Sequence, residues 1–539
     1  MSLLFLLAAV AAAFAGWRIW RRLRFFLHVF QLEGYNPRQY THWLRLRVRT
    51  VIVRTSHLLA AATLLLAWAI GVWGSPFWAA LVALMAWPIL FASSRIYRSD
   101  RQKKPLKYTP RLRRLLALSA LLGMVLVSAG LAAGLSTAGA GGFLWFLVGL
   151  FLVDLGAPFL ILLTALLLAP AESAVQSGFK ARARRTLAHH PNLTIIGITG
   201  SYGKTSVKFI IAAILRRRYN VLATPGSFNT PMGICLVINE RLRPEHQMLV
   251  LEMGARYAGD IRELCEIARP HVVVVTSVGF AHLESMGSVE AIEREKGSLV
   301  SCAADGAVTV LNGDDPRVFR MRERARGPVW TTSTAGENAT ITAREVRYDA
   351  MGASFVVQDE TGQAMTFRTR LLGDHNVGNV LLGVAVGRAM GLRLRQIARA
   401  VEELKPVEHR LELKREGHLT IIDDAFNSNP VGARSAVEVL GQFNSGKRII
   451  ITPGMIELGT RQEEENRLLG RHIAKHADLA ILVGSEQTRP IQEGLKESAY
   501  PDENVRVVSS LFEARDILRQ VARPGDVVLF ENDLPDQYS

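Results

Sequence analysis

Residues 193–215 read LTIIGITGSYGKTSVKFIIAAIL, and this stretch decides the fold of the chain that follows it. Its apolar start, residues 193–198, predicts a buried parallel strand. Gly200 and Gly203 then mark a tight turn, and Lys204 begins a helix whose apolar residues recur every three or four positions. A strand, a Gly-rich turn and a helix N-terminus together direct free backbone N–H groups and the positive end of the helix dipole toward an anion. We therefore expect a phosphate-binding loop here.

The spacing within this loop indicates a nucleotide. Lys204 is placed to reach the β- and γ-phosphates, and the Thr205 hydroxyl is placed to bind Mg²⁺. The usual P-loop has a Gly five residues before its Gly-Lys pair, where this chain has Ile198. An ordinary strand-to-helix turn with an exposed lysine is the alternative. The predicted nucleotide-binding residues of the loop are Gly200, Ser201, Gly203, Lys204, Thr205 and Ser206.

The basic charge of the chain is concentrated in its N-terminal part. The formal net charge of the 539 residues is +16. Residues 1–192 hold 22 Lys and Arg against 4 Asp and Glu, whereas the rest holds 42 against 44. The excess lies among apolar runs, so it indicates membrane topology and not nucleic-acid binding. The three cysteines have neither zinc-site nor disulfide spacing, which favours a reducing cytoplasm for the C-terminal part.

Five apolar runs precede the phosphate loop, at about residues 3–17, 57–74, 76–93, 115–135 and 143–169. The connecting segments 18–56 and 94–114 carry nine Lys and Arg each, and the other two connections carry none. By the positive-inside rule, we expect a multi-pass membrane protein with five spans. Its N-terminus would lie outside, and everything after about residue 170 would lie in the cytoplasm. Asp154 is inside the fifth run, where a carboxylate is either a functional site or a polar contact between helices.

From residue 193 onward, strand, turn and helix alternate, which predicts α/β domains built on parallel sheets. Residues 340–370 alternate apolar and polar side chains and predict a small antiparallel insertion. A second series of strands and helices begins near Pro406. We therefore predict an α-helical membrane domain, a basic linker, a central P-loop domain and a Rossmann-like C-terminal domain, at residues 1–170, 171–192, 193–405 and 406–539.

Several polar side chains come at the ends of the predicted strands, where parallel sheets gather ligands. Glu252 ends a buried strand and is well placed to bind Mg²⁺, with a helix N-cap or a surface acid as the alternative. His282 follows the next strand, where a lone histidine is more often structural. Lys296 lies in a charged helix, for which a solvated face is the alternative. Further polar motifs are DHNVGN, HRLE and IIDDAFNSNP at residues 374–379, 409–412 and 421–430.

The order and spacing of these motifs resemble those of the Mur ligases. The series covers residues 193–460 and reads TGSYGKTS, SFNTPMG, EMGARYAGDI, VGFAHLESMGSVEAIEREKGSL, LNGDD, GDHNVGN, HRLE, IDDAFNSNP and GMIELG. The branch that it resembles most joins D-alanyl-D-alanine to UDP-N-acetylmuramoyl-tripeptide in peptidoglycan precursor synthesis. The resemblance implies that ATP phosphorylates a substrate carboxylate and that an amine attacks the acyl-phosphate. An amide, ADP and phosphate would result.

The resemblance also implies roles for individual residues. Lys204 would bind the phosphates, Thr205 and Glu252 would bind one Mg²⁺, and His282 would bind a second. Lys296 matches the lysine that family members carbamylate, which turns a cation into an anionic Mg²⁺ ligand. Two Mg²⁺ ions would lower the repulsion between the carboxylate and the γ-phosphate. The remaining implied contacts are Arg410 to the γ-phosphate, Asn376 and Asn379 to the adenine, and Asp424 to the ribose.

The chain departs from this resemblance in its N-terminal part. Related enzymes begin with a soluble domain that binds the UDP-sugar, whereas this chain has predicted spans and a short linker there. Phe426 also stands where Tyr is usual. The carboxylate donor could therefore be a soluble or a lipid-linked muropeptide. A ligase that extends a poly-γ-glutamyl or similar envelope polymer is a second interpretation. A P-loop membrane ATPase or transport component is a third, which the matches at Glu252, His282 and Lys296 disfavour.

Overall fold

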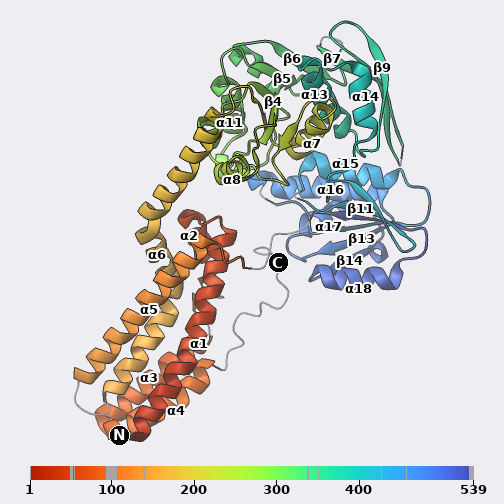
Figure 1. The fold of residues 1–539 in the computed structure, drawn as a ribbon. Coiled ribbons are helices and arrows are strands. Elements are labelled where there is room, and N and C mark those ends of the chain that lie inside the picture. Colours follow the sequence, from red (N-terminus) through yellow and green to blue (C-terminus); the bar gives the residue numbers. More distant parts are fainter. Residues whose placement is uncertain are drawn as a thin grey trace. The chain divides into compact units, whose positions relative to one another are not determined.

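The computed structural model describes residues 2–48, 52–53, 55–92, 106–136, 141–336, 339–349, 351–426, 428–456 and 458–532. The chain divides into two compact units, which are residues 1–175 and 176–534 apart from a few residues at the C-terminus. The described elements of the first unit are helices, and those of the second are strands and helices (Figure 1). Asn427, in the motif at residues 421–430, lies outside the described residues.

The first unit consists of helices with mostly apolar side chains. Their bounds are α1 Ser2–Leu32, α2 Pro37–Leu46, α3 Thr55–Trp73, α4 Pro76–Ala92, α5 Pro110–Ser136 and α6 Gly141–Ala188. By length and composition, four helices of the described part could cross a membrane, namely α1, α3, α5 and α6, and α4 contains a shorter apolar helix. Among the described residues, each of the five apolar runs therefore lies almost entirely in one helix, and four of these helices reach spanning length.

A buried ionic cluster joins α1, α3 and α6 inside this unit. Asp154 is 0% exposed, and its Oδ2 lies 3.1 Å from Arg18 Nε and 2.8 Å from His57 Nε2. Arg22 Nε lies 3.8 Å from the same oxygen. A charge in an apolar interior is costly when it is alone, so each member of the cluster depends on the others. Of the two alternatives for Asp154, the structure shows the polar contact between helices.

The helix α6 continues beyond the last apolar run, so the basic stretch predicted as a linker is helical as far as Ala188. From residue 176 onward it belongs to the second unit. There, Lys180 Nζ forms an ion pair with Glu263 Oε1 at 2.6 Å, and Ala183 is buried in an apolar core. The end of the helix is therefore packed onto the α/β part of the chain.

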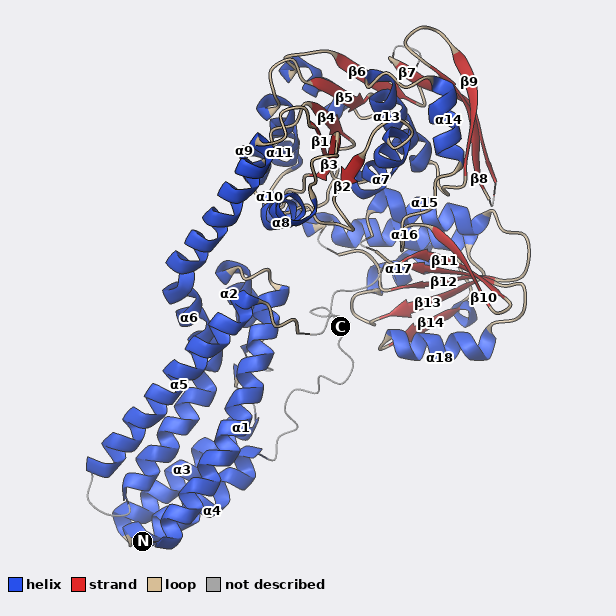
Figure 2. Ribbon diagram, viewed as in Figure 1, coloured by secondary structure: helices blue, strands red, loops and turns tan. Residues whose placement is uncertain are grey.

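The second unit begins with a nine-stranded sheet in the order β2-β3-β1-β4-β5-β6-β7-β8-β9 (Figure 2). Its strands pair in parallel from β2 to β7, and β7, β8 and β9 pair antiparallel. The predicted antiparallel insertion is thus present, as hairpins that extend one edge of the parallel sheet. The strand bounds are β1 Thr194–Thr199, β2 Val221–Ala223, β3 Met248–Glu252, β4 Val272–Val275, β5 Val308–Asn312, β6 Val329–Ser333, β7 Ile341–Asp349, β8 Gly352–Gln358 and β9 Ala364–Thr369.

Helices cover both faces of this sheet, because successive residues of a strand point to opposite sides and here both sides are apolar. Ile196 faces one core, and Leu249 faces the other. The helices on the side of Ile196 are α7 Lys204–Leu215, α13 His375–Ala389 and α14 Leu394–Glu402. Those on the side of Leu249 are α8 Pro231–Arg241, α9 Asp260–Ile267 and α11 Val289–Cys302.

A second sheet follows in the order β10-β11-β15-β12-β13-β14, with β10 antiparallel and the others parallel. The series of strands and helices predicted to begin near Pro406 is present, and it includes the polar strand β10. The strand bounds are β10 Glu412–Glu416, β11 Leu419–Asp424, β12 Arg448–Thr452, β13 Leu479–Val483, β14 Val505–Val508 and β15 Val527–Glu531. The helices are α15 Pro430–Gly441, α16 Gln462–His476 and α17 Arg489–Glu497 on one face, and α18 Leu511–Val521 on the other (Figure 2).

Candidate active site

The loop between β1 and α7 contains two glycines with positive φ. Gly200 has φ +151°, and a Cβ at this position would lie 1.9 Å from Thr276 Oγ1. Gly203, directly before α7, has φ +78°, and its Cβ would lie 2.6 Å from Asn379 Oδ1. Glycine is required at both positions, because other residues rarely adopt these angles and would also clash. The loop is therefore a narrow backbone cradle at the N-terminus of a 12-residue helix, an arrangement that binds phosphate.

Lys204 folds back over this loop. Its Nζ donates hydrogen bonds to the carbonyl oxygens of Gly200 at 2.8 Å and of Ser201 at 3.2 Å. Burial lowers the pKa of Lys204, and the positive charge of Arg410 adds to this effect. An anion bound to the loop would lie against this ammonium group and offset the cost of burying it.

Thr205 and Glu252 form the oxygen pair predicted to bind Mg²⁺. The Thr205 hydroxyl donates to Glu252 Oε2 at 2.9 Å, and Glu252 is 1% exposed at the end of β3. Although burial alone would raise the pKa of Glu252, Lys208 and Lys204 keep it below its usual value. The side chain is therefore an anion at neutral pH.

This pair fits a magnesium ion that takes most of its ligands from elsewhere. Mg²⁺ prefers oxygen ligands, and it usually keeps waters and phosphate oxygens beside one or two protein ligands. Within the described ranges, no group of three or more His, Cys, Asp or Glu side chains is placed to bind a metal ion. Thr205 and Glu252 would thus supply one hydroxyl and one carboxylate, and a nucleotide would supply phosphate oxygens.

His282 and Lys296 lie within electrostatic range of Lys204. Burial, together with Lys204 and Lys296, lowers the pKa of His282 to about 3. Burial, together with Lys204, lowers the pKa of Lys296 to about 7, and the Lys296 side chain is 1% exposed. At neutral pH the imidazole is therefore neutral and a large fraction of the amine is unprotonated. These are the protonation states that a metal ligand and a nucleophilic amine require.

Arg410 approaches the loop from the C-terminal part of the unit. Its Nη2 lies 3.4 Å from Thr205 Oγ1, and its guanidinium carbon lies 4.8 Å from the centre of the Phe426 ring. Phe426 thus provides the aromatic face that the usual tyrosine would also offer. Asp424 ends β11 and accepts a hydrogen bond from the backbone N–H of Leu411 at 3.1 Å. Burial raises the pKa of Asp424 to about 6.

Asn376 and Asn379 lie in the first turns of α13, beside the loop. Asn379 Nδ2 donates to Asn376 Oδ1 at 2.9 Å, and Asn376 Nδ2 donates to the carbonyl of Leu372 at 2.7 Å. Asn379 Oδ1 is also the atom that a Cβ on Gly203 would meet. Ser206 is half-buried in the first turn of α7. The structure brings these side chains to the cradle, and their contacts with a nucleotide stay predictions.

Two residues that the sequence reasoning did not single out also contact Glu252. Lys208 is 0% exposed, and its Nζ lies 3.2 Å from Glu252 Oε2. Asn229 Nδ2 donates to Glu252 Oε1 at 3.0 Å. The sequence offered one indication of the position of Lys208. It lies four residues after Lys204, and residues four apart lie on the same face of a helix.

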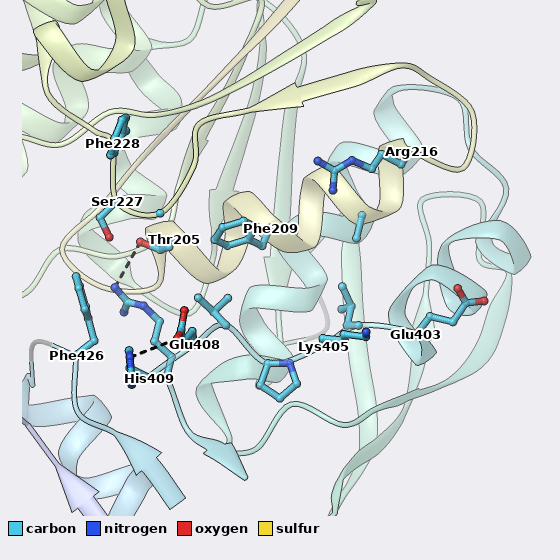
Figure 3. Close-up of a pocket in the computed structure, with 16 residues that line it drawn as sticks. Thr205, Phe209, Arg216, Ser227, Phe228, Glu403, Lys405, Glu408, His409 and Phe426 are labelled. Atoms are coloured by element: carbon cyan, nitrogen blue, oxygen red, sulfur yellow. Dashed lines mark hydrogen bonds and ion pairs between the residues drawn. The ribbon is translucent and has the colours of Figure 1, made fainter. Parts of the chain in front are cut away.

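A pocket of about 730 Å³ opens beside Thr205 (Figure 3). Its walls are α7, the loop between β2 and α8, and the segment between α14 and β10. Thr205 and Phe426 lie toward one end, and Arg216 lies toward the other (Figure 3). The pocket thus extends along α7 away from the phosphate loop, with a mixed apolar and charged lining that includes Phe209, Phe228, Glu403, Leu404, Lys405, Pro406, Val407, Glu408, His409 and Arg410.

Comparison with known proteins shows which protein family the second unit resembles. The model of the Mur ligase middle domain matches residues 198–387, and that of the Mur ligase glutamate ligase domain matches residues 409–531. The UDP-N-acetylmuramoyl-tripeptide--D-alanyl-D-alanine ligase of Mycobacterium bovis is 35% identical over 359 residues, which cover 62% of this chain and 70% of that protein. The chain belongs to the Mur ligase family. Members of this family are ADP-forming ligases, and the enzyme class expected from the motifs is therefore confirmed.

Solved Mur ligase structures agree with the fold. MurF from Acinetobacter baumannii is 27% identical with a TM-score of 0.61, and the match covers 67% of this chain and 78% of that one. MurF from Thermotoga maritima in complex with ADP is 26% identical with a TM-score of 0.59, covering 66% and 80%. The predicted α/β fold with Mur ligase central and C-terminal domains is thus confirmed. The two family models do not extend into the helical unit.

Proposed function

We propose that this Mur ligase is an ATP-dependent amide ligase of the MurF type, which acts in peptidoglycan synthesis through an acyl-phosphate. The observation that carries the proposal is the pair of contacts made by Thr205. Its hydroxyl bonds to the buried carboxylate of Glu252 and is also reached by Arg410 from the C-terminal part. The names of the mycobacterial and Bacillus subtilis relatives, which join D-alanyl-D-alanine to UDP-N-acetylmuramoyl-tripeptide, support this substrate class.

In this proposal, some side chains around the loop bind the nucleotide and Mg²⁺, and others stabilise charge during the reaction. Lys204 and the N–H groups of the loop bind the β- and γ-phosphates, and Thr205 and Glu252 bind Mg²⁺. When bound, Mg²⁺ lowers the repulsion between the two anionic reactants. Arg410 stabilises the charge on the γ-phosphate while it passes to the substrate carboxylate. Because Arg410 comes from the C-terminal part, the reaction requires both α/β domains to close around ATP.

We also propose that Lys296 is carbamylated. The neutral amine nitrogen attacks CO₂ and forms an N–C bond, a proton passes to solvent, and the product is an anionic carbamate. With a pKa lowered to about 7, roughly half of the Lys296 side chains are neutral at pH 7. An ordinary lysine is neutral in fewer than about one molecule in a thousand at that pH. The carbamate would provide, with His282, oxygen and nitrogen ligands for a second Mg²⁺.

We propose that the pocket beside Thr205 binds the substrate whose carboxylate is activated. A carboxylate at the end near Thr205 and Arg410 would lie next to the phosphate loop, where phosphate transfer occurs. The rings of Phe209, Phe228 and Phe426 would then cover apolar parts of the same substrate. Replacing Phe228 by Ala should raise the KM for the carboxylate donor several-fold and leave the affinity for ADP unchanged. If Phe228→Ala and the unmodified chain have the same KM for the carboxylate donor, the substrate does not bind in this pocket.

We further propose that the helical unit inserts into the bacterial cytoplasmic membrane with five spans, its N-terminus outside and the ligase part in the cytoplasm. The asymmetry of Lys and Arg between the connecting segments supports this topology. With this topology, the ligase part lies at the membrane surface, within reach of a lipid-linked muropeptide as the carboxylate donor. Reporter fusions at residues 75 and 139 should give alkaline phosphatase activity, and fusions at residues 105 and 532 should give green fluorescence. The opposite pattern would refute the topology.

The function is tested by ADP release from the full chain in detergent, with UDP-N-acetylmuramoyl-tripeptide and with or without D-alanyl-D-alanine. We expect a product heavier by one dipeptide in the mass spectrum, and no product from Lys296→Ala. A lipid-linked muropeptide is compared as donor in parallel. ATP turnover that never depends on an amine would refute the ligase and favour a transport ATPase. Repeated addition of single amino acids would favour the polymer ligase instead.

A further inference from the structure

The carboxylate of Glu252 has two connections to the loop of residues 224–230, between β2 and α8. Lys208 Nζ donates a hydrogen bond to the carbonyl of Gly226 and lies 3.2 Å from Glu252 Oε2. Asn229 Nδ2 donates to Glu252 Oε1 at 3.0 Å. Each oxygen of the carboxylate is therefore connected to this loop, one through Lys208 and the other through Asn229.

Lys208 is an unusual residue for a helix face that packs on a sheet. Its side chain is 0% exposed, and a buried ammonium group is costly unless it is paired and hydrogen-bonded. The carboxylate of Glu252 and the carbonyl of Gly226 take two of its three N–H donors. Glu252 Oε2 also accepts the hydroxyl of Thr205. A cation that binds this oxygen must therefore compete with Lys208 for its negative charge.

The same loop forms one wall of the pocket. Gly226, Ser227 and Phe228 line it together with Thr205. In Figure 3, Ser227 and Phe228 lie on the same side of the pocket as Thr205, and Phe426 faces them from the C-terminal part. A ligand in the pocket therefore contacts the segment whose backbone is bound to Lys208.

We propose that Lys208 is a positioning residue that couples the pocket to the metal site. The inference rests on the proposed function, because it takes Glu252 as the Mg²⁺ ligand. When Mg²⁺ neutralises Glu252, Lys208 loses part of its attraction to the carboxylate, and its contact with Gly226 changes. In the other direction, a ligand that displaces the loop moves Lys208 and Asn229 and thereby the carboxylate. By linkage, each site changes the binding affinity of the other by the same factor.

The test is hydrogen–deuterium exchange of residues 224–230 in the full chain in detergent, with Mg²⁺ and ADP, with ADP and EDTA, and without additions. In the unmodified chain we expect Mg²⁺ with ADP to change the exchange rates of these amides at least threefold, and ADP with EDTA to leave them unchanged. Lys208→Met keeps the side-chain length and removes the charge. We expect it to bind ADP, as measured by calorimetry, and to lose the metal-dependent change. Lys475→Met, an exposed lysine of α16, is the matched control and should respond like the unmodified chain.

Two results would overturn the coupling while leaving the proposed function intact. One is an unmodified chain that binds Mg²⁺ with ADP but shows no change in residues 224–230. The other is a Lys208→Met variant whose loop responds as the unmodified chain does. An unmodified chain that binds no nucleotide would refute the proposed function and the coupling together. If Lys208→Met does not fold, Lys208→Gln removes the positive charge and keeps a polar side chain, and an undiminished metal-dependent change in this variant overturns the coupling.

Discussion

Replacing Gly203 by alanine tests the geometry of the phosphate loop directly. Gly203 has φ +78°, and the added Cβ would lie 2.6 Å from Asn379 Oδ1. Alanine at this position must therefore adopt a left-handed conformation and also displace the Asn379 side chain. That displacement breaks the hydrogen bond from Asn379 Nδ2 to Asn376 Oδ1, which is 2.9 Å long.

The expected cost follows from these two contributions. A left-handed backbone costs an L-residue about 1–2 kcal/mol. A lost hydrogen bond between neutral side chains costs about 1 kcal/mol. Without nucleotide, the loop can relax to relieve the strain. We therefore expect most of this free energy to reduce the affinity for ADP, because the bound nucleotide requires the original loop conformation. A total of roughly 2–3 kcal/mol corresponds to an ADP affinity weaker by about 30- to 150-fold.

The assay is calorimetric titration of the full chain in detergent with Mg²⁺ and ADP. Gly306→Ala is the matched control, because Gly306 has φ +74° and a Cβ there would meet nothing within 4 Å. It carries the same backbone strain far from the loop, so its ADP affinity should stay within about twofold of the unmodified chain. Equal ADP affinities for Gly203→Ala and Gly306→Ala would refute the assignment of this loop to phosphate binding.

Three further predictions concern charged side chains. Because burial and Lys204 lower the pKa of Lys296 to about 7, and only the neutral amine reacts with CO₂, ligation should rise with pH through about 7. A flat profile for ADP release between pH 6 and 8 would contradict it. Arg410→Met should lower kcat roughly a hundredfold while the ADP affinity from calorimetry changes little, and an unchanged kcat would exclude a role in the reaction. Asp154→Ala should destabilise the helical unit by about 3–5 kcal/mol, seen as a lower Tm in detergent, and an unchanged Tm would show that the ionic cluster is dispensable.

The phosphate loop was predictable because the residues that define it are local. Two glycines, a lysine and a threonine follow one another between an apolar strand and an amphipathic helix, so sequence order alone places them together. The parallel strands were predictable for a similar reason, since a strand with both faces buried is a continuous apolar run. The strand β10 was missed because its sequence, ELKRE, is polar. This strand is held by its backbone hydrogen bonds to β11, which do not require an apolar pattern in the sequence.

The surroundings of Glu252 were only partly predictable, because they depend on contacts between distant residues. Thr205, Lys208 and Asn229 are 47, 44 and 23 positions away from it in the chain. Thr205 belongs to a known motif, so its partner could be guessed from the edge of the sheet. Lys208 lies outside the quoted motifs, and Asn229 lies in SFNTPMG, a motif to which no contact with Glu252 was assigned. The same limit applies to Asp154, whose partner Arg18 is 136 positions away.

The charge balance of the site explains why it suits a nucleotide. Lys204, Lys208 and Arg410 all act on the single carboxylate of Glu252, and Lys296 lies within range of Lys204. The described contacts give the buried amine of Lys296 no hydrogen bond or ion pair. The buried cation Arg18 of the helical unit differs in this respect, because it donates hydrogen bonds to both Asp154 and Ser56. Cations in such surroundings raise the free energy of the empty protein, which is why burial lowers the pKa values of Lys204 and Lys296. The polyphosphate chain of a nucleotide supplies the missing negative charge. Its binding therefore stabilises the cations that are unfavourable in the empty protein, and this stabilisation adds to the affinity for the nucleotide.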